Sequence, residues 1–214
     1  MKNILDFTRE ELVQWLDSQG MRPFRAGQIF KWLYLKNVDT FDQMTDLSKD
    51  TRVLLESHFV IRRLDRVRAQ VSADTTRKFL FGLQDGQHIE SVLIPEKDHF
   101  TLCVSSQAGC AMNCAFCLTA KGGLVRNLTL AEITSQVRDV RKLLMDEGMD
   151  PLRLSNLVFM GMGEPLANYD TLIRALSTLT DTDFGFKFSP RRVTVSTCGL
   201  VPKIIRLGQD TTVN

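Results

Sequence analysis

The residues after position 98 alternate between short apolar runs and amphipathic segments, and this alternation restricts the fold more than any other feature of the sequence. Apolar runs predict strands and apolar spacing of helical period predicts helices, in the order strand 102–105, helix 129–145, strand 157–160, helix 169–179, strand 193–196 and helix 201–207. Strands that alternate with helices form βα units around a parallel sheet. The sequence therefore predicts an α/β protein with three consecutive βα units.

Three βα units are too few to close a barrel, which needs eight strands in the best-known case. The last four residues, TTVN, look like the first half of a fourth strand. An open parallel edge at this point would be prone to pair with other chains. We therefore expect this sequence to be the front part of a longer protein.

The first 97 residues follow other patterns. Residues 1–60 read as short helices, and Thr8 with Glu11 has the spacing of a capping box. Residues 61–97 read as a β-meander with a hairpin signal at Asp85-Gly86, followed by a charged linker. We predict a helical accessory domain at 1–60, a meander and linker at 61–97, and the βα part at 98–214.

The composition is that of an ordinary globular protein, with 43% hydrophobic and 24% charged residues. The formal net charge of +2 gives no overall field that would attract a nucleic acid, so any basic surface must be local. The N-terminal segment MKNILDFTREEL lacks the apolar region of a secretory signal, and no apolar run is long enough to cross a membrane. We expect a cytoplasmic protein without a membrane partner.

Cys110, Cys114 and Cys117 form a CxxxCxxC triad directly after the first predicted βα strand. Iron-sulfur clusters are held by cysteine thiolates, usually four of them, so three thiolates leave one iron open. The amino and carboxylate groups of S-adenosylmethionine can chelate that iron. Active sites of α/β folds lie at the carboxyl ends of parallel strands, where this loop begins. The triad therefore predicts a 4Fe-4S cluster that binds S-adenosylmethionine and starts radical chemistry.

Other interpretations of these residues stay open at the level of spacing. A structural zinc ion could use the three cysteines with His99, although zinc motifs usually come as two spaced pairs. The cysteines could also be inert core residues. Phe116, between the last two cysteines, could be a core residue or could border the cluster or an adenine ring.

Three segments of the chain carry a family resemblance, namely AGCAMNCAFCLTAKGGLVRNLT, NLVFMGMGEPLANYD and SPRRVTVSTCG. They resemble the radical S-adenosylmethionine RNA methyltransferases of the RlmN/Cfr family, most closely the RlmN type. The resemblance runs from about Phe79 to the end, and the helical start is similar to the accessory domain of that family. It implies a partial radical SAM (β/α) barrel, of which this chain holds the first three βα units, preceded by a small helical plus β-meander accessory domain.

The resemblance also implies a reaction, the methylation of C2 of an adenosine in 23S rRNA and of an anticodon-adjacent adenosine in tRNA. This carbon is electron-poor, so the family uses a radical route in which a C-terminal cysteine first carries the methyl group. No residue of this sequence matches that cysteine, and we expect the chain alone to be inactive. The family further implies an external, flavodoxin-like electron donor and a monomeric full-length enzyme.

The resemblance assigns cofactor contacts to three residues outside the triad. Gly163 and Glu164, in the GMGEP turn after the second βα strand, match the contact to the methionyl part of S-adenosylmethionine. Ser196 matches a further cofactor contact. Taken without the resemblance, a glycine-rich turn and a serine at the end of a strand are also common structural features.

Glu90 and Cys103 match residues that act on the substrate in the family. Glu90 matches the carboxylate proposed to remove the C2 proton, and Cys103 matches a cysteine thought to form a transient disulfide with the methyl-carrying cysteine. By residue type alone, Glu90 would be a solvent-facing strand residue and Cys103 a core residue. We assign no role to Cys198, where the family often has a small residue.

Basic residues gather in the meander and before the third βα strand, at Arg62, Arg63, Arg66, Arg68, Arg77, Lys78, Arg191 and Arg192. Such clusters are usually solvated, but the meander group is a candidate for contacts with RNA phosphates. Three alternatives to C2 methylation remain at this stage. They are a C8-adenosine methyltransferase of the Cfr type, a radical enzyme with another substrate, and an RNA-binding module stabilised by a metal.

Overall fold

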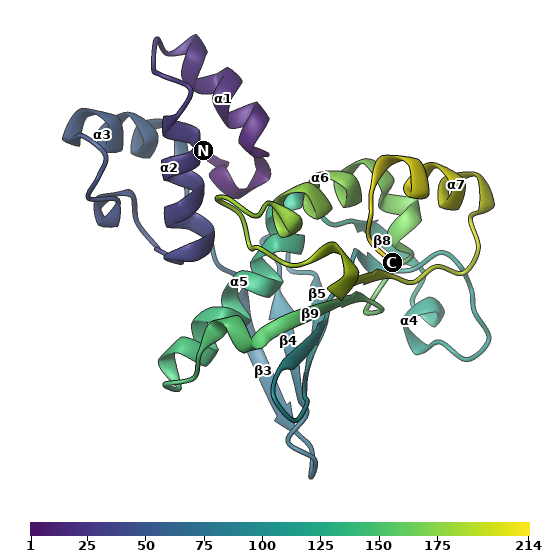
Figure 1. Ribbon diagram of the computed structural model, residues 1–214. Helices are drawn as coiled ribbons and strands as arrows, with labels where there is room; N and C mark the ends of the chain where they lie inside the picture. The colour runs from purple at the N-terminus through teal and green to yellow at the C-terminus, as the bar shows by residue number, and fades with distance from the viewer.

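The computed structural model describes all residues 1–214, and a six-stranded sheet forms its centre (Figure 1). The strand order is β10 (Val193–Val195), β9 (Leu154–Phe159), β6 (Phe100–Cys103), β5 (His88–Pro95), β4 (Arg77–Gly82) and β3 (Asp65–Val71). Strands β6, β9 and β10 are parallel, whereas β3 to β6 form an antiparallel meander. The predicted α/β class and the partial, unclosed sheet are confirmed. The meander and the βα strands share one sheet, so the predicted boundary at residue 97 lies between two paired strands.

Two helices, α5 (Leu130–Asp146) and α6 (Tyr169–Thr180), cover one face of this sheet (Figure 1). Helix α5 begins where the sequence predicts, because Thr129 and Glu132 form a capping box with both hydrogen bonds present. The strand residues that face the helices are buried, namely Phe79, Phe81, Ile89, Leu93, Leu102, Leu157 and Val193. The alternate residues of the central strands are only partly buried, so the opposite face, here called the open face, is not covered.

The N-terminal part contains α1 (Arg9–Ser18), α2 (Arg25–Phe30), a π-helical turn (Lys31–Leu35) and α3 (Lys49–His58). It is closed by β1 (Lys2–Asn3), which pairs in parallel with β2 (Phe59–Val60). The predicted capping box at Thr8 is present. From the sequence, the helix that begins at Ser48 is expected to bury Val53 and Leu54, and this is wrong by one position, because Leu55 is fully buried whereas Val53 is 56% exposed.

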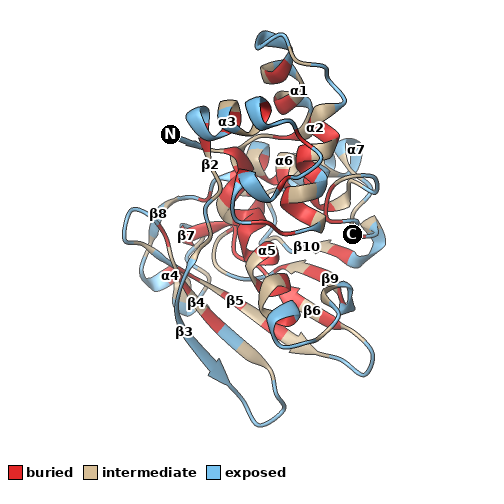
Figure 2. Cartoon of the chain, turned by 90° about the vertical axis from the view of Figure 1, so that its left-hand side faces the viewer, coloured by how far each residue is buried: buried red, intermediate tan, exposed pale blue.

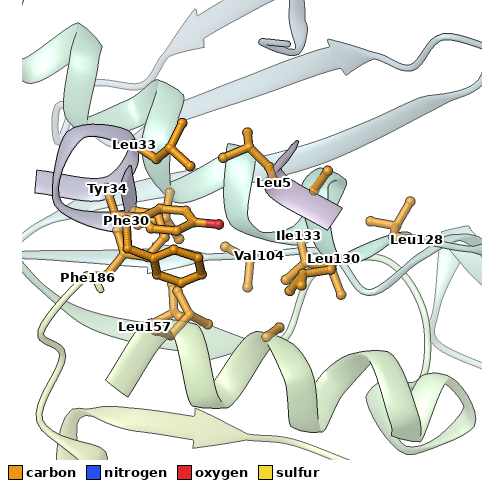
Figure 3. Close-up of a cluster of buried hydrophobic side chains, with 14 of the residues drawn as sticks. Leu5, Phe30, Leu33, Tyr34, Val104, Leu128, Leu130, Ile133, Leu157 and Phe186 are labelled. Atoms are coloured by element: carbon orange, nitrogen blue, oxygen red, sulfur yellow. The ribbon is translucent and has the colours of Figure 1, made fainter. Parts of the chain in front are cut away.

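One continuous hydrophobic core joins the N-terminal helices to the sheet layer. Figure 3 shows the contact, where Leu5, Phe30 and Tyr34 meet Ile133 and Leu157. Figure 2 places most buried residues in this region, between the helices and the sheet.

A buried arginine adds polar contacts to the same junction. Arg138 of α5 is fully buried and donates to the backbone carbonyls of Leu33 and Val38. In return, the side chain of Asn37 donates to the carbonyl of Arg138 at 2.8 Å. Burial lowers the pKa of Arg138 to about 10, which still leaves the group charged at neutral pH. The helical part is therefore docked on α5 by hydrogen bonds as well as by apolar packing.

Several elements near the cysteines were not predicted. Strand β7 (Gln107–Gly109) pairs antiparallel with β8 (Leu124–Asn127), and a short helix α4 (Leu118–Lys121) lies between them. The last helix is α7 (Val201–Asp210). None of the helices has both the length and the apolar character needed to cross a membrane.

The four C-terminal residues form no strand, although they were expected to begin one. Asn214 nevertheless lies beside β10. Its N–H donates to Val193 O at 3.0 Å, and its carbonyl accepts from Val195 N at 2.7 Å.

Candidate functional site

The cysteine loop lies inside the small β7–β8 hairpin, past the carboxyl end of β6. Cys110 is buried, and its N–H donates to Gly123 O at 2.9 Å. Gly109 has a φ of +75°, and a Cβ atom there would lie 2.0 Å from Gly123 O, so only glycine fits. Cys114 and Cys117 are half-buried, and all three thiols are free. The hairpin therefore fixes the first cysteine while the loop holds the other two nearer to solvent.

The triad shares one cavity of about 330 Å³ with the ends of strands β9 and β10. Both strands run parallel to β6, so their carboxyl ends meet at the edge of the sheet where the cysteine loop begins. The cavity is lined by all six residues predicted to hold the cluster and the cofactor, namely Cys110, Cys114, Cys117, Gly163, Glu164 and Ser196. Residues from three separate segments of the chain are thus brought together, while their roles stay predictions.

The GMGEP turn is held against the hairpin by close backbone contact. Gly163 has a φ of +97°, and a Cβ atom there would lie 2.5 Å from Gln107 Cβ. Gln107 Oε1 accepts a hydrogen bond from Glu164 N at 2.8 Å. The buried Glu164 carboxylate in turn accepts from Leu166 N at 2.9 Å and from Cys198 N at 2.8 Å. Burial opposes ionisation of Glu164, but the hydrogen bonds from Cys198 and Leu166 outweigh it and lower its pKa.

Replacing Gly163 with alanine is expected to destabilise the protein more than the same change at Gly148. Both glycines have a positive φ, so each alanine costs about 1–2 kcal/mol of backbone strain. Only at Gly163 does the new methyl group overlap Gln107, at a further cost of about 1–3 kcal/mol, because a methyl group at Gly148 would have no neighbour within 4 Å. Urea denaturation of both variants checks this, and equal losses would contradict the close contact.

The arrangement fits an iron-sulfur cluster better than a zinc ion. His99, the fourth ligand that the zinc interpretation needs, precedes β6 at the opposite end of the strand from the triad. Its Nε2 lies 2.8 Å from Asn156 Nδ2, and its Nδ1 lies 2.7 Å from Asp98 Oδ1. No group of three His, Cys, Asp or Glu side chains, the triad included, lies close enough together to hold a metal ion. Three thiols around one open cavity match the ligand set of a cluster with a free iron.

Residues 104–213 match the family model of the Radical SAM superfamily, which covers more than half of the chain. The chain belongs to the radical SAM superfamily. Residues 2–61 match the model of the ribosomal RNA large subunit methyltransferase N-terminal domain. The two matches cover separate parts of the chain.

Curated relatives carry the name dual-specificity RNA methyltransferase RlmN. That of Desulfosudis oleivorans is 57% identical over 213 residues, which are 100% of this chain and 56% of the relative. That of Geotalea uraniireducens is 53% identical over 212 residues, 99% of this chain and 59% of the relative. The resemblance to RlmN-type proteins is therefore confirmed, and the chain spans little more than half the length of these relatives.

A solved structure supports the fold. The radical SAM methyltransferase from Sphaerobacter thermophilus superposes with a TM-score of 0.87 at 41% sequence identity. The superposition covers 98% of this chain and 60% of that protein.

In this radical SAM chain, Glu90 and Cys103 lie on the open face rather than in the cluster cavity. Glu90 is on β5, and its carbonyl accepts a hydrogen bond from Ser105 Oγ at 2.6 Å. Cys103 is on β6, opposite Val92 of β5, and burial raises the pKa of its thiol. Glu90 was predicted to lie outside the βα part, but pairing of β5 with β6 brings it beside the strand that leads into the cysteine loop.

Two residues of the cavity differ from their sequence-based interpretation. Phe116 is 93% exposed, which contradicts the interpretation as a core residue. It lines the cavity beside the cysteines, so the interpretation as a residue that borders the cluster or an adenine ring stays a prediction. Cys198, to which no role was assigned, lines the same cavity. Local desolvation and the neighbouring Glu164 carboxylate raise the pKa of Cys198 to about 11, so this thiol is protonated at neutral pH. Its position two residues after Ser196 was the only feature of the sequence that could have placed Cys198 in this cavity.

Proposed function

We propose that the protein to which this chain belongs is a radical SAM RNA methyltransferase. It methylates C2 of an adenosine in 23S rRNA and of an anticodon-adjacent adenosine in tRNA, through a methyl-cysteine intermediate. The observation that carries the proposal is the single cavity shared by the cysteine triad and the residues after β9 and β10. The names of the similar proteins, dual-specificity RNA methyltransferases, support RNA as the substrate.

The cavity residues divide into cluster ligands and cofactor contacts. Cys110, Cys114 and Cys117, which line the cavity, would hold a 4Fe-4S cluster, and Gly163, Glu164 and Ser196 would contact S-adenosylmethionine. When bound, this pair supplies a 5′-deoxyadenosyl radical after one-electron reduction by an external, flavodoxin-like donor.

The remaining residues of the chain position and protect these groups. Glu164 braces the turn after β9 against the loop after β10, because each carboxylate oxygen accepts a backbone N–H from one of these segments. Glu90 accepts the proton that leaves C2. Its side chain is 41% exposed, so an adenine ring can reach it. Cys103 is the candidate for the transient disulfide. Substrates of this kind place the enzyme in the cytoplasm, where we expect it to act as a monomer.

Anaerobic reconstitution of the complete protein with iron and sulfide tests this function. With S-adenosylmethionine, a reductant and RNA, we expect 5′-deoxyadenosine together with 2-methyladenosine, identified by mass spectrometry of digested RNA. Formation of 8-methyladenosine instead would favour the Cfr-type alternative. A reconstituted cluster that yields neither product would contradict a methyltransferase. Bound zinc without visible absorption would favour the metal-stabilised RNA-binding module.

A further inference from the structure

The basic residues of the meander do not form one patch, because a β-bulge divides them between the two faces of the sheet. The pairing of β3 with β4 shifts between Arg66 and Arg68, so that Arg66 lies opposite Phe81 and Arg68 lies opposite Leu80. Residues directly opposite each other in a sheet share a face. Phe81 is buried beneath α5, whereas Leu80 alternates with it. Arg66 therefore faces α5, and Arg68 projects from the open face.

The next strand divides its two cations in the same way. Arg77 Nη1 lies 2.7 and 2.8 Å from the carboxylate oxygens of Glu147, which directly follows α5. Lys78 is on the open face, and its Nζ lies 3.0 Å from Glu90 Oε1. The candidate base is thus paired with a lysine of the neighbouring strand.

The open face around Glu90 carries two cations, Arg68 and Lys78, and a second carboxylate, Asp65, which lies opposite Gly82. Arg68 and Glu90 both lie opposite Leu80, two strands apart and thus roughly 10 Å from each other. The side chain of Arg68 makes no ion pair or hydrogen bond within the chain, and every residue of β3 is exposed, as Figure 2 shows. A lysine ammonium carries three donors, so Lys78 can hold Glu90 and a second anion together. The side chain of Arg68, which has no partner within the chain, and the remaining ammonium donors of Lys78 suit a phosphodiester.

We propose that Arg68 and Lys78 bind the phosphodiester backbone of the RNA on the open face and hold the target nucleotide beside Glu90. The proposal rests on the proposed function for the nature of the substrate and for the role of Glu90. It names Arg68 and Lys78 as positioning residues and assigns no such role to Arg66 and Arg77, which lie on the same two strands but face α5.

The matched pair of faces allows a controlled binding experiment. The variant Arg68→Gln with Lys78→Gln is compared with Arg66→Gln and Arg77→Gln, which removes the same charge from the same strands. Binding of a short fluorescein-labelled RNA hairpin with an unpaired adenosine is followed by anisotropy over a salt series, with the complete protein. For the open-face variant, the negative slope of the log binding constant against log salt concentration is expected to become shallower by about 0.7 for each phosphate that is no longer neutralised. The slope of the other variant is expected to equal that of the wild type.

A charge-preserving variant, Arg68→Lys with Lys78→Arg, keeps the proposal testable if the glutamine variant folds poorly, and it should retain the wild-type slope. Equal slope losses on the two faces, or an unchanged slope in a folded open-face variant, would overturn the proposal. Binding does not require radical chemistry. If the variants show the predicted slopes but the wild-type protein forms no methyladenosine, the proposed function alone is refuted. If the wild-type protein methylates RNA but the slope of the open-face variant is unchanged, only the phosphate site is refuted.

Discussion

Replacing Cys114 with serine is expected to abolish cluster assembly and, with it, the formation of 5′-deoxyadenosine. The three thiols that line the cavity are the whole protein ligand set of the proposed cluster, so losing one leaves two irons without a protein ligand. The loss should exceed the ~10–100-fold effect typical of residues that only support a metal ligand. Iron and sulfide content, visible absorption and electron paramagnetic resonance after anaerobic reconstitution measure it.

Cys198 provides the matched control, because its thiol lines the same cavity but lies outside the triad. Cys198→Ser should retain the iron content of the wild type. A variant at Cys198 that lost the cluster while Cys114→Ser kept it would show that the three-cysteine assignment is wrong. The backbone hydrogen bond from Cys198 N to Glu164 is unaffected by either change.

Replacing Gln136 with leucine is expected to destabilise the fold by about 3–5 kcal/mol, since each buried group left without a partner costs about 1–3 kcal/mol. Gln136 lies on α5 and is fully buried. Its Oε1 accepts from Ser91 Oγ and Ser105 N, both at 2.8 Å, and its Nε2 donates to Ser105 O at 2.9 Å. Leucine has a similar volume, so the loss comes from these unsatisfied groups. Urea denaturation followed by tryptophan fluorescence measures the change.

The same substitution at an exposed glutamine is the control. It separates the cost of unsatisfied buried groups from the effect of changing glutamine to leucine. Gln19 is exposed and its side chain bonds only to Ser18, so Gln19→Leu should change the stability by no more than about 0.5 kcal/mol. Comparable losses at the two positions would contradict the role of the buried network. Ser105 also accepts a hydrogen bond from Met162 N in the GMGEP turn, at 2.8 Å, so the damage at Gln136 should extend to the candidate site.

The helices and the buried strands could be predicted because their signals are local. Thr8 and Thr129 begin helices through contacts within four residues, and the apolar runs of β6 and β9 are buried against α5 and α6. The β7–β8 hairpin was missed for the converse reason. Most of β8 is exposed, and its partner Gln107–Gly109 has no apolar alternation, so nothing local distinguishes the hairpin from a loop.

The burial of two polar residues could not be predicted from the sequence either. Gln136 and Arg138 have the residue types of a solvated helix face, yet both are fully buried. Their partners are distant in the sequence, and most of them are backbone groups, such as those of Ser105 and Leu33. Such partners exist only after the helix has docked, so residue type alone predicts the wrong environment.

The chemistry proposed for the site follows from the amino-acid order alone, because Cys110, Cys114 and Cys117 lie within one short loop of the sequence. What surrounds them depends on how the strands pair. Parallel pairing of β6, β9 and β10 brings Glu164 and Ser196 to the triad, and pairing of β5 with β6 brings Glu90 into the same sheet. A single extra residue in β3 then reverses the alternation of side chains, and such a bulge is defined only by the partner strand.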